Sequence, residues 1–192
     1  MHTIRCVAAE WLIVRARLFR TRLGMWLVLL AAAFAWAAPP GALAPLAGRT
    51  GLLAGILCVA FAAGSRSDRL ALRLSLGHPT SPLALATGRW LGATVAASLA
   101  VTGVALAAAL RDGLPAPTVL AGWMHGVGSA AAAAAATLPA VLTGGNNSAA
   151  VLLAAAALLD AAVLSHPAFI YVAGLCVLGG VPTAASWLAR RQ

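Results

Sequence analysis

The sequence contains no lysine and only four acidic residues, although thirteen arginines give it a formal net charge of +9. With so few carboxylates, catalysis by a pair of acids and a metal site built from acidic residues are both disfavoured. The three cysteines, Cys6, Cys58 and Cys176, are scattered and match neither a disulfide framework nor a metal-binding spacing. A phosphate-binding loop and a cysteine–histidine set are also missing. We therefore expect no metal or cofactor in this chain itself.

Charged residues make up only 9% of the 192 residues, whereas 62% are hydrophobic. A soluble domain of this length cannot bury so much apolar surface in one core, so the solvent must be a lipid bilayer. In a membrane protein an excess of arginine more often reflects topology than nucleic-acid binding, and we expect no nucleic-acid partner. The lack of lysine beside so much alanine is typical of GC-rich bacterial genomes, which favours a bacterial inner membrane.

Six apolar segments approach the length of a spanning helix, which is about 20 residues for a hydrocarbon core of ~30 Å. They are Gly24–Ala38, Thr50–Gly64, Trp90–Leu110, Thr118–Leu142, Ser148–Leu164 and Ala168–Leu188. The sequence thus predicts an all-α polytopic membrane protein, with a single transmembrane domain over residues 1–192. Pro39 and Pro40 end the first segment, and "PPGALAPLAGR" is interpreted as an apolar turn at the interface. Because the first two segments are short, the alternative for residues 24–64 is a hairpin that does not fully cross.

Arginine is distributed very unevenly between the two sides that six spans define. One side holds Arg5, Arg15, Arg17, Arg20, Arg22, Arg66, Arg69, Arg73, Arg89, Arg190 and Arg191. The other side holds only Arg49 and Arg111. By the positive-inside rule the first side is cytoplasmic. Both termini and the loop between the second and third spans are therefore expected in the cytoplasm.

Residues 3–22, before the first span, are predicted to form an amphipathic helix. On a period of about 3.6 residues, Trp11 and Phe19 fall on an apolar face, whereas Glu10 and Arg17 fall on the opposite face. A basic amphipathic helix with aromatic residues beside a span is typical of an interfacial helix on the cytoplasmic leaflet. A solvated basic tail is the alternative.

The longest polar interruption of the chain is residues 65–89, "SRSDRLALRLSLGHPTSPLALATGR". Leucines and arginines recur at helical spacing over Arg66–Leu76, which predicts a cytoplasmic helix of about three turns. Gly77 can end this helix, and two prolines then break the chain. Arg89 and Trp90 are expected to anchor the re-entry at the interface. The length and pattern favour a docking element over the alternative, a plain basic connector.

An N-terminal interfacial helix, six spans and this first cytoplasmic loop together resemble the permease subunit of ABC-2 type transporters. The matching loop residues are Asp68, Arg69, Leu72, Leu74, Leu76, Pro79, Ser81, Gly88 and Arg89. The sequence differs from that family in lacking the Gly-Thr that often follows the acid–Arg pair. It also joins the fifth and sixth spans by little more than "SHP".

The resemblance implies that the loop is a coupling helix that docks on a separate ATP-binding subunit. The residues expected at this contact are Arg66, Asp68, Arg69, Leu72, Arg73, Leu74, Leu76 and Pro79. It further implies that the partner binds ATP and Mg, that this chain is not itself an enzyme, and that it dimerises with a second copy or a paralogous permease. The transported substrate is not carried over from the family.

Inside the predicted spans, His125 and Asp160 fall at similar depths and are candidates for an intramembrane polar pair, because an acid there should face protein or water. Solvation of each at the interface is the alternative. Repeats of small residues four apart predict close helix contacts at Gly51/Gly55, Gly88/Gly92 and Gly122/Gly126/Ala130.

Two other functions remain open. The chain resembles an intramembrane serine protease only faintly, through Ser129 and His166, and the Gly-x-Ser-Gly pattern is absent. A small structural membrane subunit of a larger complex is the other alternative.

Overall fold

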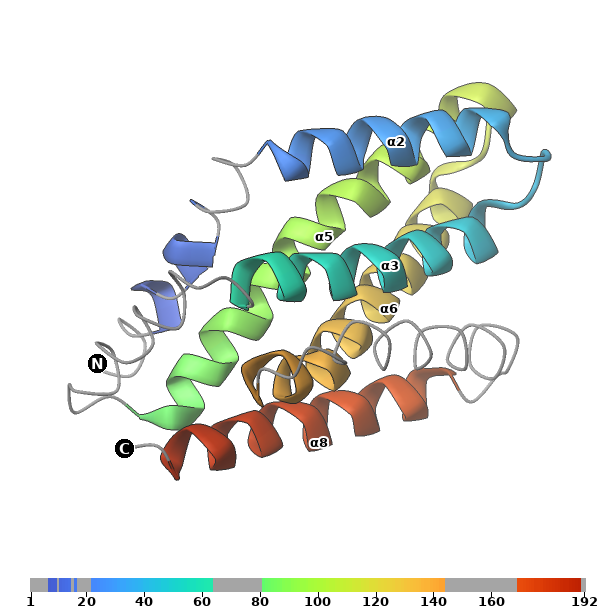
Figure 1. The fold of residues 1–192 in the computed structure, drawn as a ribbon. Coiled ribbons are helices and arrows are strands. Elements are labelled where there is room, and N and C mark those ends of the chain that lie inside the picture. The colour runs from blue at the N-terminus through green and yellow to red at the C-terminus, as the bar shows by residue number, and fades with distance from the viewer. Residues whose placement is uncertain are drawn as a thin grey trace.

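The computed structural model describes residues 7–9, 11–14, 16, 22–63, 81–143 and 169–190, and throughout these residues the regular structure is helical (Figure 1). The labelled helices are α2 (Leu23–Ala37), α3 (Leu43–Ala63), α5 (Pro82–Asp112), α6 (Ala116–Thr143) and α8 (Phe169–Ala189). The described part contains no β-strand, so the predicted all-α class is confirmed there. Residues 7–9, 11–14 and 16, within the predicted interfacial helix, are also helical.

Among the described residues, three helical stretches are long and apolar enough to cross a membrane: Leu43–Phe61, Pro82–Asp112 and Ala116–Thr143. The stretches Val28–Ala37 and Ala173–Ala189 are apolar but shorter. The described residues thus mark a membrane-embedded protein, but they do not support all six predicted spans. The fifth predicted span, Ser148–Leu164, lies outside the described residues. At 15 residues, α2 falls short of the roughly 20 that a straight crossing needs.

Proline positions explain why two helices begin earlier than the sequence predicted. Pro82 occupies the first turn of α5 behind Ser81, and Pro45 lies in the first turn of α3. The N–H groups of a first turn have no intrahelical acceptor, so proline costs little there. The turn after α2 is therefore only residues 38–42, with Gly41 at φ 79°. The interpretation of "PPGALAPLAGR" as one long apolar turn was wrong.

Helix α5 lies at the centre of the bundle and contacts α2, α3, α6 and α8. The most extensive contact is between α3 and α6, where two of the three predicted small-residue repeats, Gly51/Gly55 and Gly122/Gly126/Ala130, face each other. A Cβ on Gly51 would collide with the carbonyl oxygen of Gly126, and one on Gly55 would lie 2.6 Å from that of Ala130. The close approach of these two backbones, predicted from the sequence, is confirmed.

The ends of the helices divide the described arginines into two groups (Figure 1). The turns at 38–42 and 113–115 lie at one end of the bundle, and Arg49 and Arg111 belong to the helices that meet there. The end of α3, the start of α5 and the end of α8 lie at the opposite end, with Arg22, Arg89 and Arg190. This is the grouping that the predicted topology requires of these five residues.

Candidate functional site

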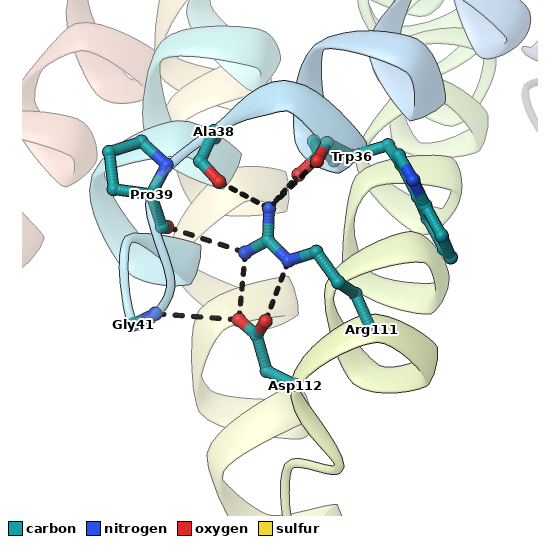
Figure 2. A network of polar contacts seen from close by, with 7 residues as sticks. Trp36, Ala38, Pro39, Gly41, Arg111 and Asp112 are labelled. Carbon is teal, nitrogen blue, oxygen red and sulfur yellow. Dashed lines mark hydrogen bonds and ion pairs between the residues drawn. The ribbon is translucent and has the colours of Figure 1, made fainter.

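The densest polar cluster in the described part of the chain joins the end of α5 to the turn between α2 and α3 (Figure 2). Arg111 lies in the last turn of α5, and its Nη1 donates to the carbonyl oxygens of Ala35, at 2.6 Å, and of Trp36, at 3.1 Å. Nη1 also donates to the carbonyl of Ala38, and Nη2 donates to that of Pro39 at 3.3 Å. One guanidinium therefore donates hydrogen bonds to the last carbonyls of α2 and to the first carbonyls of the turn that follows.

Asp112 holds this guanidinium in place. Its Oδ1 accepts from Arg111 Nε at 2.6 Å, and its Oδ2 accepts from Nη2 at 2.8 Å. The same Oδ2 accepts the backbone N–H of Gly41 at 3.4 Å. The two-pronged pairing fixes the plane of the guanidinium, as is typical of arginine with carboxylates. The pair thus binds both the carbonyls before the turn and an N–H within it.

The cluster caps the C-terminal end of α2 with a side chain from another helix, α5. The last carbonyls of a helix lack intrahelical donors, and a cation near them is favoured by the helix dipole. Helix α2 has no basic residue in its own last turn. Arg111, more than seventy positions away in the sequence, supplies that charge. The sequence did not predict this cluster, for which the only signal is an Arg-Asp pair before the helix-ending Gly113.

The eight residues expected to contact an ATPase lie outside the described residues. They are Arg66, Asp68, Arg69, Leu72, Arg73, Leu74, Leu76 and Pro79. What the structure does describe is the helices on either side, since α3 ends at Ala63 and α5 begins at Pro82. Any contact made by these eight side chains remains a prediction.

The two residues expected to anchor the loop at the interface, Arg89 and Trp90, also take part in the packing of the helices. Because α5 begins at Pro82, Arg89 and Trp90 lie about two turns inside the helix. Arg89 is only 3% exposed. The indole N–H of the half-buried Trp90 donates to the carbonyl of Ala131 in α6 at 2.9 Å. Trp90 therefore ties α5 to α6.

His125 is half-buried in α6, whereas Asp160 lies outside the described residues, so their pairing remains a prediction. Ser129, named for the protease alternative, is 2% exposed, and its hydroxyl donates to the carbonyl of His125 at 2.9 Å. This is the local bond that serine commonly makes inside helices. His166 lies outside the described residues. In the described part of the chain, no three side chains of His, Cys, Asp or Glu gather as metal ligands would.

An apolar groove opens between α2 and α3. Helix α2 packs along α5 and touches α3 only slightly, which leaves a groove of about 310 Å³ between the two, with Ala100 of α5 in its lining. Leu30 and Phe34 line it from α2, and Leu53 and Leu57 from α3. Arg49 and Thr50 also line it.

None of the protein-family models, curated proteins or solved structures with which the chain was compared matches it.

Proposed function

We propose that the chain is the membrane permease subunit of an ATP-driven transporter, which docks a separate ATPase through residues 65–89. The permease has six spans with both termini in the cytoplasm of a bacterial cell, and it dimerises with a second copy or a paralogue. The partner subunit binds ATP and Mg. The proposal rests on the ABC-2 resemblance of the loop and on the bundle that carries it.

One observation carries the proposal furthest. Most of the loop segment lies in the connection between α3, which ends at Ala63, and α5, which begins at Pro82. Each of these helices contains one of the three stretches among the described residues that are long enough to cross a membrane. Their joined ends lie at the end of the bundle that carries Arg22, Arg89 and Arg190 (Figure 1). By the positive-inside rule, this is the end that an ATPase in the cytoplasm would meet.

The test changes Leu72 and Leu74 together to Asp. Leucines at a docked contact are buried, and an unpaired carboxylate in such a contact costs several kcal/mol, roughly 3–5 by measurements on broken buried ion pairs. The double variant should therefore insert and fold normally but lose co-purification with the partner ATPase, and should no longer stimulate ATP hydrolysis.

The matched control is Ala116→Asp with Thr118→Asp. Both residues are exposed in the first turn of α6, at the opposite end of the bundle, where acids suit a helix N-terminus. This control adds the same charge and should keep the ATPase. Retention of the ATPase by the loop variant would refute the docking proposal. Failure of any ATPase to co-purify with the unaltered protein would favour a structural subunit or an enzyme.

A further inference from the structure

We propose that the groove between α2 and α3 binds one phospholipid, with the phosphate on Arg49 and an acyl chain along the groove. Arg49 lies near the 38–42 turn, whereas the ends of α3 and α5 that flank the loop, Ala63 and Pro82, lie at the opposite end of the bundle. The binding site is thus separate from ATPase docking, and either proposal can fail without the other.

The polar groups of the groove lie toward one end of it, with Leu46 one turn beyond them on α3. Arg49 and Thr50 lie in the second turn of α3, near the turn at 38–42, and Arg49 is exposed. From there the groove runs along α3 to Leu57 between aliphatic and aromatic side chains. A phosphate is the anionic group that a phospholipid always carries, and arginine binds it with charge-assisted hydrogen bonds. Charge at one end and apolar surface along the rest match an amphiphile rather than a soluble anion.

The length and depth of the groove also fit one leaflet. Arg49 and Leu57 are eight residues apart on α3, which corresponds to about 12 Å along a helix. Half of a ~30 Å hydrocarbon core is about 15 Å. Since Arg49 is nearer the 38–42 end of the bundle, a phosphate beside it lies toward the membrane surface and the acyl chain points toward the midplane.

The side chains along the groove are exposed to whatever fills it. Leu30 is 54% exposed, Phe34 68% and Leu53 50%. Because α2 and α3 both pack on α5 rather than on each other, the floor of the groove is the small side chain of Ala100. A slender acyl chain suits such a narrow, open-sided space, and the lipid bilayer supplies it at high concentration.

The experiment is native mass spectrometry of the purified full-length protein titrated with phosphatidylglycerol, with a diacylglycerol of the same chains as the phosphate-free probe. The unaltered protein should retain one phosphatidylglycerol and bind diacylglycerol much more weakly. Arg49→Gln should weaken phosphatidylglycerol binding by about tenfold, since a hydrogen bond to a charged group contributes at least about 1.5 kcal/mol. Arg49→Lys, which keeps the positive charge, should weaken phosphatidylglycerol binding much less than Arg49→Gln does.

Leu53→Trp tests the groove independently, because a bulky ring there should block the acyl chain and weaken both lipids. The controls are Arg190→Gln, which removes a charge at the opposite end of the bundle, and Leu175→Trp, which enlarges an exposed leucine of α8. Both should bind as the unaltered protein does. Equal binding of phosphatidylglycerol and diacylglycerol, or unchanged binding by Arg49→Gln and Leu53→Trp, would overturn the proposal.

Discussion

The guanidinium of Arg111 shows how one side chain substitutes for a missing local cap. Helix α2 ends at two prolines, which offer no backbone N–H of their own to its last carbonyls. Arg111 donates to two of these carbonyl groups, at Ala35 and Trp36, and to the carbonyls of Ala38 and Pro39 in the turn that follows. In a bilayer, where water is scarce, leaving such groups without donors is especially costly. The charge therefore helps to fix the 38–42 turn against α5.

Replacement of this arginine gives the first residue-scale prediction. Arg111→Met should lower the midpoint of thermal unfolding in detergent, because the carbonyls of α2 lose their donors and Asp112 loses its cation. Asp112→Asn should also lower it. The double variant should lose less than the sum of the two, since both residues act through one cluster. Arg190→Met, a change of the same kind at an exposed site beyond α8, is the control and should leave the midpoint nearly unchanged. Strictly additive losses would mean that the two side chains act independently.

At the scale of whole helices, the crossing of α3 and α6 depends on the absence of side chains. Gly55 in α3 approaches the carbonyl of Ala130 so closely that a Cβ would stand 2.6 Å from its oxygen. Helix backbones that come this near gain contact along their whole length, which replaces the hydrophobic driving force that lipid does not provide. A similarly close approach of two backbones occurs between α8 and α6, where Gly180 faces the carbonyl of Ala135.

Gly55→Ala should therefore destabilise the protein by about 1–3 kcal/mol, the usual cost of overpacking a close contact. The comparison is Gly179→Ala in α8, where a Cβ would meet no atom of the described residues within 4 Å. There the same substitution should be neutral or stabilising by up to about 1 kcal/mol, since alanine favours the helix. Unfolding in detergent, followed by circular dichroism, measures both. Equal changes in the free energy of unfolding of the two variants would show that α3 and α6 can move apart at their crossing without loss of stability.

The close helix crossing was predictable from the sequence, whereas the helix starts and the Arg111 cluster were not. Glycines four apart are a local pattern, and local patterns determine which face of a helix permits close approach. The starts of α3 and α5 were misjudged because Pro45 was assigned to an apolar turn and Pro82 to a break, although a first turn accepts proline. The cluster depends on two turns meeting at one end of the bundle, which no spacing within the sequence encodes.

The same limit applies to Arg49. The sequence placed Arg49 in an interfacial turn and predicted that it is one of only two arginines on the less basic side. Because α3 starts early, Arg49 instead lies on a helix, beside an apolar groove. The groove exists because α2 packs against α5 rather than against α3. The sequence could assign the charge to a side of the membrane. Only the packing of three helices could show what lies next to it.

For the whole molecule, the orientation in the membrane is the prediction on which the transporter proposal depends. Eleven of the thirteen arginines fall on one side of the predicted topology, and that side should be cytoplasmic. In a variant with Cys6, Cys58 and Cys176 replaced by alanine, single cysteines at Arg73 and Arg190 should not react with an impermeant thiol reagent added to intact cells. A cysteine at Ala116, exposed beside the turn at 113–115, should react and serves as the positive control. Permeabilised cells should show labelling at all three positions, which verifies that each thiol is accessible. Labelling of position 73 in intact cells would place the loop outside, where no ATP-binding subunit can reach it. Labelling of position 190 would place the C-terminus outside and contradict the six-span topology.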